Sequence, residues 1–162
     1  MVKEIKKEEI KGYITGALTL STEKIEGAID AYKRENYGQV LSTLYYGYFN
    51  LIKALLYQKG FDPKSHEGVY SLLNLHFIKH GTFDKKYSRL FEQLHKAREV
   101  ADYNPLAPKY DKRDADEYIQ KLFEIIPGII KTIGNYSKYF AGVTKSIEEL
   151  NRLTHQGNKD NL

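Results

Sequence analysis

Residues 40–56, VLSTLYYGYFNLIKALL, decide how the rest of the chain is arranged. Their apolar and aromatic side chains recur at helical spacing and cover a wide arc of one helix. The residues of this arc are Val40, Leu41, Leu44, Tyr45, Tyr48, Phe49, Leu51, Ile52, Leu55 and Leu56. An apolar arc of this width is typical of a helix that neighbours contact from several sides. We therefore predict a central helix from Tyr37 to Lys59, capped at its C-terminal end by Gly60.

The segments next to this helix show the same periodicity. Apolar residues of one stripe run through 10–32 and predict a long first helix. After the turn at 60–68, in which Ser65 or Asp62 is the candidate N-cap residue, a third helix is expected to continue to about Lys79. No segment alternates apolar and polar residues with the period of two that a half-buried strand shows, so we expect no β-sheet.

The second half of the chain adds further helices. A fourth helix is expected over 84–102, and after a loop with two prolines a fifth begins near Asp114. Pro127 and Gly128 should end or kink the fifth helix, because proline lacks the N–H that a helix interior needs. The segment 129–153 is only weakly helical by its pattern, and 154–162 is expected to be a frayed tail.

These elements predict an all-α fold, an up-and-down bundle of four to five main helices with a C-terminal helical extension. We expect one helical domain over residues 1–140, followed by an extension and tail over 141–162, since 162 residues suffice for one domain with its own core. The sequence has no cysteine, no start typical of a signal peptide and no apolar run of bilayer length. A cytoplasmic location without membrane contact is therefore expected.

Positive charge is concentrated in one part of the chain. Residues 79–113 hold nine Lys or Arg and five acidic residues, so their excess of four equals the formal net charge of +4 for the whole chain. A basic patch of this kind attracts phosphate groups. An ordinary solvated helix face explains the same pattern, so charge alone leaves both interpretations open.

Arg98 breaks the polar and apolar pattern of the fourth helix. Its position falls inside the apolar stripe, with Asp102 four residues later and His95 three residues earlier at the edge of the same stripe. A guanidinium group keeps its proton in a protein, so a partly buried one needs an acidic partner or hydrogen bonds. Two interpretations follow: a structural ion pair with Asp102, or an anion-binding or catalytic site at a cleft between subunits.

Two other groups of residues invite a functional reading. His76 and His80 are spaced for two metal ligands on one helix face, but no third ligand accompanies them, so we expect a solvent-facing pair and no metal or other cofactor. Tyr46 lies with Asn50, Lys53 and Tyr57 on the less apolar side of the central helix. Aromatic rings interleaved with Lys stack on bases or seal a dimer, and we favour self-association.

The order of three motifs resembles one known family. The stretch LSTLYYGYFNLIKALLYQKGFDPKSHEGV (41–69), with a tyrosine pair and a Lys-x-His turn, is followed by REVADY (98–103). This combination resembles the HEPN superfamily (higher eukaryotes and prokaryotes nucleotide-binding domain), and is most similar to its small stand-alone prokaryotic members. The resemblance spans roughly residues 10–126. It implies an up-and-down bundle that commonly forms a homodimer, with the Arg-bearing helices around a shared cleft.

The resemblance also implies a choice of activities. Many members are metal-independent endoribonucleases, often toxins, and others act with a minimal nucleotidyltransferase as antitoxin, which in some cases adenylylates a HEPN tyrosine. The nuclease motif is an Arg followed after four to six residues by a His. Arg98 matches the Arg, but Asp102 stands at the four-on position and 99–105 contain no His. We therefore expect a nucleotide- or RNA-binding partner of a nucleotidyltransferase, with an active nuclease that uses a displaced histidine as the alternative.

The candidate residues fall into three roles. The catalytic candidates are Arg98, Asp102 and His95. The ligand-binding candidates are Arg98, Tyr103, His66, Lys64 and Tyr46. Tyr103 is also the candidate for modification by the resemblance. His66 lies in the first turn of the third helix, where free backbone N–H groups favour anions, although a His at such a position is commonly just exposed.

Overall fold

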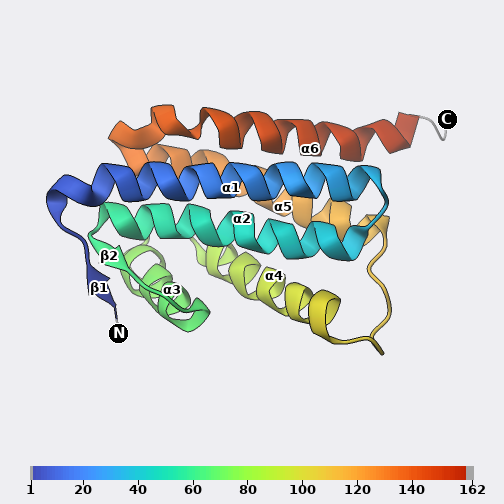
Figure 1. Ribbon diagram of the computed structural model, residues 1–162, viewed down its shortest axis with the longest axis horizontal. Helices are drawn as coiled ribbons and strands as arrows, with labels where there is room; N and C mark the ends of the chain where they lie inside the picture. The colour runs from blue at the N-terminus through green and yellow to red at the C-terminus, as the bar shows by residue number, and fades with distance from the viewer. Residues whose placement is uncertain (1, 160–162) are drawn as a thin grey trace.

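The structure is a computed structural model that describes residues 2–159, and its long helices form the bundle in Figure 1. These helices are α1 (Ile10–Lys33), α2 (Tyr37–Gln58), α4 (Lys85–Tyr103), α5 (Lys112–Ile133) and α6 (Ala141–Lys159). The shorter elements are α3 (His66–Leu73), a π-helical turn (Asn74–Ile78), 3-10 turns (Lys7–Glu9 and Gly134–Phe140) and the strands β1 (Lys3–Glu4) and β2 (Phe61–Asp62). The predicted all-α bundle is confirmed.

The helix α2 lies at the centre, as its wide apolar arc predicts. It packs against α1, α3, α4 and α5, while α6 runs along α1 and α5 on the far side (Figure 1). Leu44, Leu51 and Leu55 are completely buried along its length. Tyr48 is also completely buried, and its hydroxyl donates a 2.7 Å hydrogen bond to the backbone carbonyl of Tyr87 in α4.

Polar caps fix where the helices begin. The Asn36 side chain accepts from the backbone N–H of Gln39 at the start of α2. Ser65 caps α3 by accepting from the N–H of Gly68 at 3.0 Å, which decides between the two N-cap candidates. A reciprocal capping box of Asp111 and Asp114 starts α5. The cap therefore places the first residue of α5 just before the predicted start.

The C-terminal third differs from the prediction. Pro127 does not end α5, which continues to Ile133, because the second half of the helix buries Ile129 and Ile133 in the core. The prediction of weak helicity after this point is also wrong. The helix α6 buries Val143, Ile147 and Leu150 and continues to Lys159, beyond the expected start of fraying, while residues 160–162 lie outside the described residues.

A small sheet that the sequence pattern did not predict joins the N-terminus to the α2–α3 connection. Lys3 pairs with Asp62 and Glu4 with Phe61 in antiparallel register, and the Ile5 N–H donates to the Gly60 carbonyl at 2.8 Å. Gly60 adopts a φ of +90°, which favours glycine. Strands of two residues are too short to show alternation. Among residues 2–159, no helix has both the length and the apolar character needed to cross a bilayer.

A buried carboxylate anchors this sheet. The Asp62 side chain is only 1% exposed, and its two oxygens lie 3.5 Å from Lys53 Nζ and 2.7 Å from Lys64 Nζ. The Lys53 ammonium also lies over the rings of Phe49 and Tyr57, at 5.7 and 5.2 Å from their centroids. Two cations therefore neutralise one acid where β2 meets α2.

Gly128 allows a close approach between α5 and α4. A Cβ at this position would overlap the hydroxyl of Tyr87, which stacks on Phe83 with 4.1 Å between ring centroids. Gly128→Ala should lower the free energy of unfolding by about 1–3 kcal/mol, because an overpacked core must shift. Urea denaturation measures this change. In the Tyr87→Phe background the same substitution should cost little, and an equal cost in both backgrounds would contradict the overlap.

Candidate functional site

Arg98 lies on α4 beneath three tyrosine rings. Its side chain is 16% exposed, and the guanidinium carbon lies 5.1 Å from the ring centroid of Tyr46, 5.6 Å from that of Tyr45 and 5.5 Å from that of Tyr103. One terminal nitrogen of Arg98 donates to the Tyr103 hydroxyl at 3.2 Å. Cation–π contacts with these rings hold the Arg98 guanidinium where α2 and α4 meet, near the surface of the protein.

Asp102 is a loose partner for this cation. Its Oδ2 lies 3.6 Å from Arg98 Nε, beyond hydrogen-bond distance, and accepts instead from the Ser42 hydroxyl at 3.1 Å. Arg98 Nε is buried and hydrogen-bonds to none of the described residues. Burial lowers the pKa of Arg98, but the nearby Tyr46, Tyr103 and Asp102 raise that pKa by more. The site therefore keeps a permanent cation with an unused donor.

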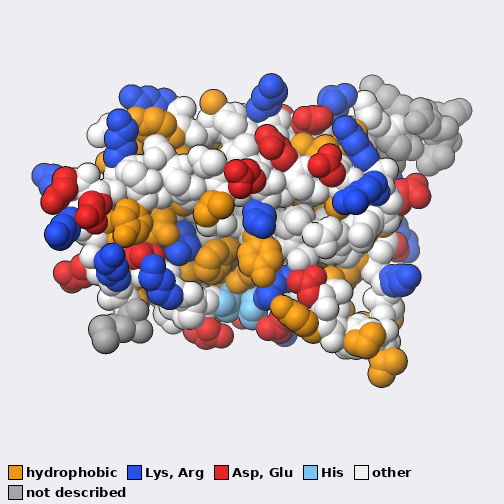
Figure 2. Space-filling view, in the orientation of Figure 1, with side chains coloured by type: hydrophobic (Ala, Val, Ile, Leu, Met, Phe, Trp, Pro, Cys, Tyr) orange, Lys and Arg blue, Asp and Glu red, His pale blue; other side chains and the backbone are white. Residues whose placement is uncertain are grey.

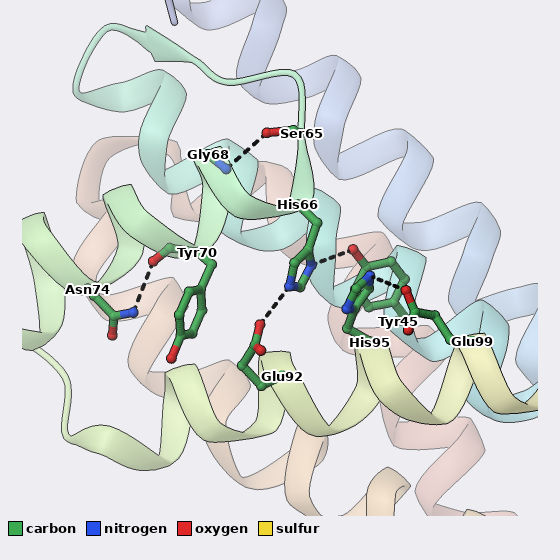
Figure 3. Close-up of polar contacts among 9 residues, drawn as sticks. All are labelled: Tyr45, Ser65, His66, Gly68, Tyr70, Asn74, Glu92, His95 and Glu99. Atoms are coloured by element: carbon green, nitrogen blue, oxygen red, sulfur yellow. Dashed lines mark hydrogen bonds and ion pairs between the residues drawn. The ribbon is translucent and has the colours of Figure 1, made fainter. Parts of the chain in front are cut away.

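A line of hydrogen bonds crosses from α2 to α4 beside this cation. The Tyr45 hydroxyl lies 2.8 Å from His66 Nδ1, and His66 Nε2 lies 2.6 Å from Glu92 Oε1 (Figure 3). A carboxylate accepts, so His66 Nε2 carries the proton toward Glu92 and Nδ1 accepts from Tyr45. Both ring nitrogens of His66 are then hydrogen-bonded within the protein, so neither is free to contact a ligand in this arrangement.

His95 stacks on the ring of His66. The two centroids are 3.6 Å apart with 13° between the planes, and His95 Nε2 lies 3.4 Å from Glu99 Oε1 (Figure 3). In Figure 2, histidine side chains reach the surface between orange and acidic side chains in the region of α3 and α4. Burial and the neighbouring His66 lower the pKa of His95. The neutral imidazole is therefore favoured near neutral pH.

This shift predicts a loss of stability in mild acid. The unfolded chain binds a proton at His95 near pH 6.5 and the folded chain only below that value, so this contribution to stability is complete above about pH 6.5 and is lost as the pH falls below it. Charge interactions with His66 and Arg98 lower the pKa of His95, whereas those with Glu92 and Glu99 raise it. Unfolding followed by circular dichroism should show a smaller loss for His95→Gln. The exposed His155→Gln should match the parent, and equal losses in all three proteins would refute the prediction.

His66, Glu92 and His95 also form the one group of three possible metal ligands among residues 2–159, with ligand atoms within 4.8 Å of one another. A metal ion bound by imidazole lies near the plane of the ring. The two rings are stacked almost parallel, so no single ion lies in both planes without a rotation of one ring. The pair expected to face solvent is divided: His76 stacks on Phe61 at 4.9 Å, and His80 is exposed.

Comparison with known proteins identifies the family. The sequence profile of the HEPN domain matches residues 18–133. The chain belongs to the HEPN family. This HEPN chain is 25% identical to a "Putative toxin" of Methanocaldococcus jannaschii over 122 residues. The match covers 75% of the chain and 91% of that protein. A second "Putative toxin" of that organism is 33% identical over 101 residues, covering 60% of the chain and 67% of the relative.

A further HEPN relative is a "UPF0332 protein" of Thermotoga maritima, 27% identical over 101 residues, which cover 62% of the chain and 76% of that protein. The profile match includes α2, α3, α4 and α5, and thus every residue of the Arg98 site. The predicted membership of the HEPN superfamily is confirmed.

The structure gathers most, but not all, of the residues predicted for a HEPN site. Arg98, Asp102, Tyr103 and Tyr46 form one cluster, and Tyr45 links it to His66 and His95. Lys64 lies apart, because its ammonium binds Asp62.

The face of α2 predicted for self-association is partly used within the HEPN chain itself. Tyr57 is buried and meets Tyr13 edge to face at 5.1 Å, and Lys53 pairs with Asp62. Packing of α1 and β2 on this face therefore leaves less of it for a partner than the helical spacing suggested.

Sequence reasoning missed Tyr45, Glu92 and Ser42. Tyr45 was counted with the core, and Glu92 with the polar stripe of the fourth helix. The spacing Glu92-x-x-His95 places both side chains on neighbouring positions of α4, and is the signal that indicates a shared site. The contact of Ser42 with Asp102 joins residues 60 positions apart, and no local pattern predicts it.

Proposed function

We propose that this HEPN protein binds a nucleotide or an RNA strand at Arg98 and acts in a toxin–antitoxin pair, with a minimal nucleotidyltransferase as the antitoxin. The observation that carries the proposal is the half-buried Arg98, framed by tyrosine rings and with its Nε donor unused. A phosphate oxygen satisfies such a donor, and the rings offer surfaces for stacking bases. The "Putative toxin" names of two relatives support the toxin role.

Tyr103 is the proposed acceptor of an adenylyl group. Its side chain is the most accessible of the three tyrosines around Arg98, with the residue 70% exposed, and its hydroxyl already contacts the Arg98 guanidinium. In the reaction the Tyr103 oxygen attacks the α-phosphorus of ATP, the bond to the β-phosphate breaks, and pyrophosphate and the hydroxyl proton leave. Arg98 stabilises the charge on the α-phosphate.

We also propose a homodimer in which the α4 helices of two subunits face a shared site. Light scattering on the purified protein measures its mass in solution. A monomer at micromolar concentration would remove this part of the proposal and leave the binding site at Arg98 to be tested separately.

Two measurements test the main proposal. Arg98→Ala should abolish growth arrest on overexpression and weaken binding of a labelled single-stranded RNA by at least tenfold, since a charge-assisted contact to phosphate is lost. Arg152→Ala, which removes an exposed Arg on α6, is the matched control and should behave as the parent. Unchanged binding and toxicity in Arg98→Ala would overturn the proposal.

A second candidate function, a metal-independent endoribonuclease, is favoured by the position of His95. This residue lies one turn before Arg98 on α4, and its lowered pKa keeps it neutral, as a general base must be. His95 takes the 2′-hydroxyl proton, the 2′-oxygen attacks the phosphorus, and the bond to the 5′-oxygen breaks to give a 2′,3′-cyclic phosphate. Arg98 stabilises the phosphorane charge, and the leaving oxygen takes a proton from water.

Cleavage of RNA in the presence of EDTA distinguishes this candidate from a binding protein. His95→Ala should abolish cleavage and retain RNA binding, whereas His80→Ala should cleave as the parent does. If the parent cleaves no RNA in either the presence or the absence of EDTA, the nuclease candidate fails and the binding function is unaffected.

A further inference from the structure

A cavity lies beside α4 and is bordered by Glu92 of the His66–Glu92 pair. It encloses about 440 Å³ between the π-helical turn and the first half of α4, and its lining includes Tyr70, Asn74, Lys85, Ser88, Arg89 and Glu92. Glu92 is shared between this cavity and the hydrogen-bond line to Tyr45. Figure 3 shows Tyr70 and Asn74 on one side of Glu92 and His95 on the other. We refer to this space as the Tyr70 cavity.

The cations of the Tyr70 cavity are free for a ligand. Lys85 and Arg89 are exposed and lie one helical turn apart on α4. Neither has an acidic side chain within 4.0 Å among the described residues, in contrast to Lys86, Lys112 and Lys121. Two unpaired cations one turn apart on one helix suit the oxygens of a phosphate group.

The other lining residues suit a nucleobase. The half-buried ring of Tyr70 is parallel to those of His66 and Phe91, within 7° and at centroid distances of 6.3 and 6.4 Å. Its hydroxyl hydrogen-bonds to no described residue, so the ring is held by packing alone. Asn74 donates one hydrogen bond, to the Tyr70 carbonyl at 3.1 Å, and keeps its side-chain oxygen as an acceptor. An aromatic face next to an amide is a common means of binding a base.

A π-helical turn forms part of the cavity wall. The Lys79 N–H donates to the Asn74 carbonyl at 2.8 Å, which closes a turn one residue wider than an α-helical turn. Such turns in other proteins are often found at functional sites. Its first and last residues, Asn74 and Ile78, both line the cavity.

The geometry points to a second nucleotide subsite in the Tyr70 cavity, which takes a nucleotide of the same single RNA strand that Arg98 contacts. The inference rests on the proposed function at Arg98. Arg89 and Arg98 are nine positions apart on α4, which is about 14 Å along the helix axis and half a turn around it, since each residue turns the helix by about 100°. A strand that reaches both therefore crosses the exposed side of α4. A mononucleotide is too short to bridge them, so an oligonucleotide is the ligand that uses both. The base stacks on Tyr70, and its phosphate lies between Lys85 and Arg89.

Fluorescence anisotropy with a labelled single-stranded RNA octamer tests the subsite. Tyr70→Leu and Arg89→Gln should each weaken binding about tenfold, as the loss of one stacked base or one phosphate contact does. Arg89→Gln should also reduce the slope of log K against log salt by about 0.7. Tyr70→Phe keeps the ring and should bind as the parent. Arg152→Gln, a single-charge loss at an exposed position of α6, is the matched control.

The outcomes separate this inference from the proposed function. If Arg98→Ala loses binding while Tyr70→Leu and Arg89→Gln bind as the parent, the subsite is refuted and the Arg98 site stands. If only the cavity variants lose binding, the Tyr70 cavity binds RNA, but the site at Arg98 and the strand shared between the two sites are refuted. If the parent binds no RNA, both are refuted. Thermal unfolding of each variant, compared with that of Tyr70→Phe, shows whether a loss of binding reflects misfolding.

Discussion

Tyr48→Ala should lower the free energy of unfolding by about 3–5 kcal/mol, the range found when a large aromatic side chain is removed from a core. Tyr48 is completely buried in the middle of α2 and meets Phe91 edge to face, with 5.9 Å between ring centroids. The cavity left behind borders both α2 and α4, which carry the Arg98 site. Urea denaturation of the purified variant measures the loss.

Tyr48→Phe is the control for this prediction. It keeps the ring and removes only the hydroxyl that donates to the Tyr87 carbonyl, so a loss of about 1 kcal/mol is expected. If Tyr48→Ala costs no more than Tyr48→Phe, the contribution of the ring to the core is refuted.

Asp62→Asn should cost about 3 kcal/mol, at the low end of the 3–5 kcal/mol for breaking a buried ion pair, because Lys53 keeps some contact with water. The Lys53 side chain is 14% exposed, and burial already lowers its pKa even though Asp62 opposes the shift. Without the acid, the ammonium of Lys53 is left against Phe49 and Tyr57. Adding Lys53→Met to Asp62→Asn should recover part of the loss, and a purely additive double variant would contradict the pairing.

The pair of Asp62 and Lys53 also makes the stability of the fold depend on pH in acid solution. Burial raises the pKa of Asp62, but the hydrogen bond from Lys64 and the charge of Lys53 lower it by more, to below the ordinary 3.8. The stabilisation is therefore present above about pH 4 and is lost as the pH falls through the folded pKa. The parent should lose stability by this route as the pH falls below about 4, and Asp62→Asn should lose less.

The central bundle was predictable because burial alone determines it. The apolar arc of α2 and the apolar stripe of α1 are buried regardless of which residues they contact. Their helical period in the sequence is therefore enough to identify both helices. The end of α5 was not predictable in this way. A proline in a helix removes one hydrogen bond, and only the tertiary burial of Ile129 and Ile133 shows that the helix continues.

The candidate site was predictable in its charge and not in its geometry. The position of Arg98 within an apolar stripe is a local property of α4. The contact of His66 with Glu92 and His95 depends on how α3 packs against α4, which no spacing within either helix reveals. The alternative that His66 is simply exposed does not hold for the same reason, since its side chain is 12% exposed.

The π-helical turn at Asn74–Ile78 also bears on the ancestry of the protein. A turn of this type differs from an ordinary helix by a single added amino acid, so one codon separates a chain with the turn from a chain without it. Deleting that codon would rotate α3 by about 100° relative to the chain on the C-terminal side of the turn. Homologues that are one amino acid shorter across this stretch would therefore turn a different side of α3 toward α4, and Tyr70 would leave the cavity wall.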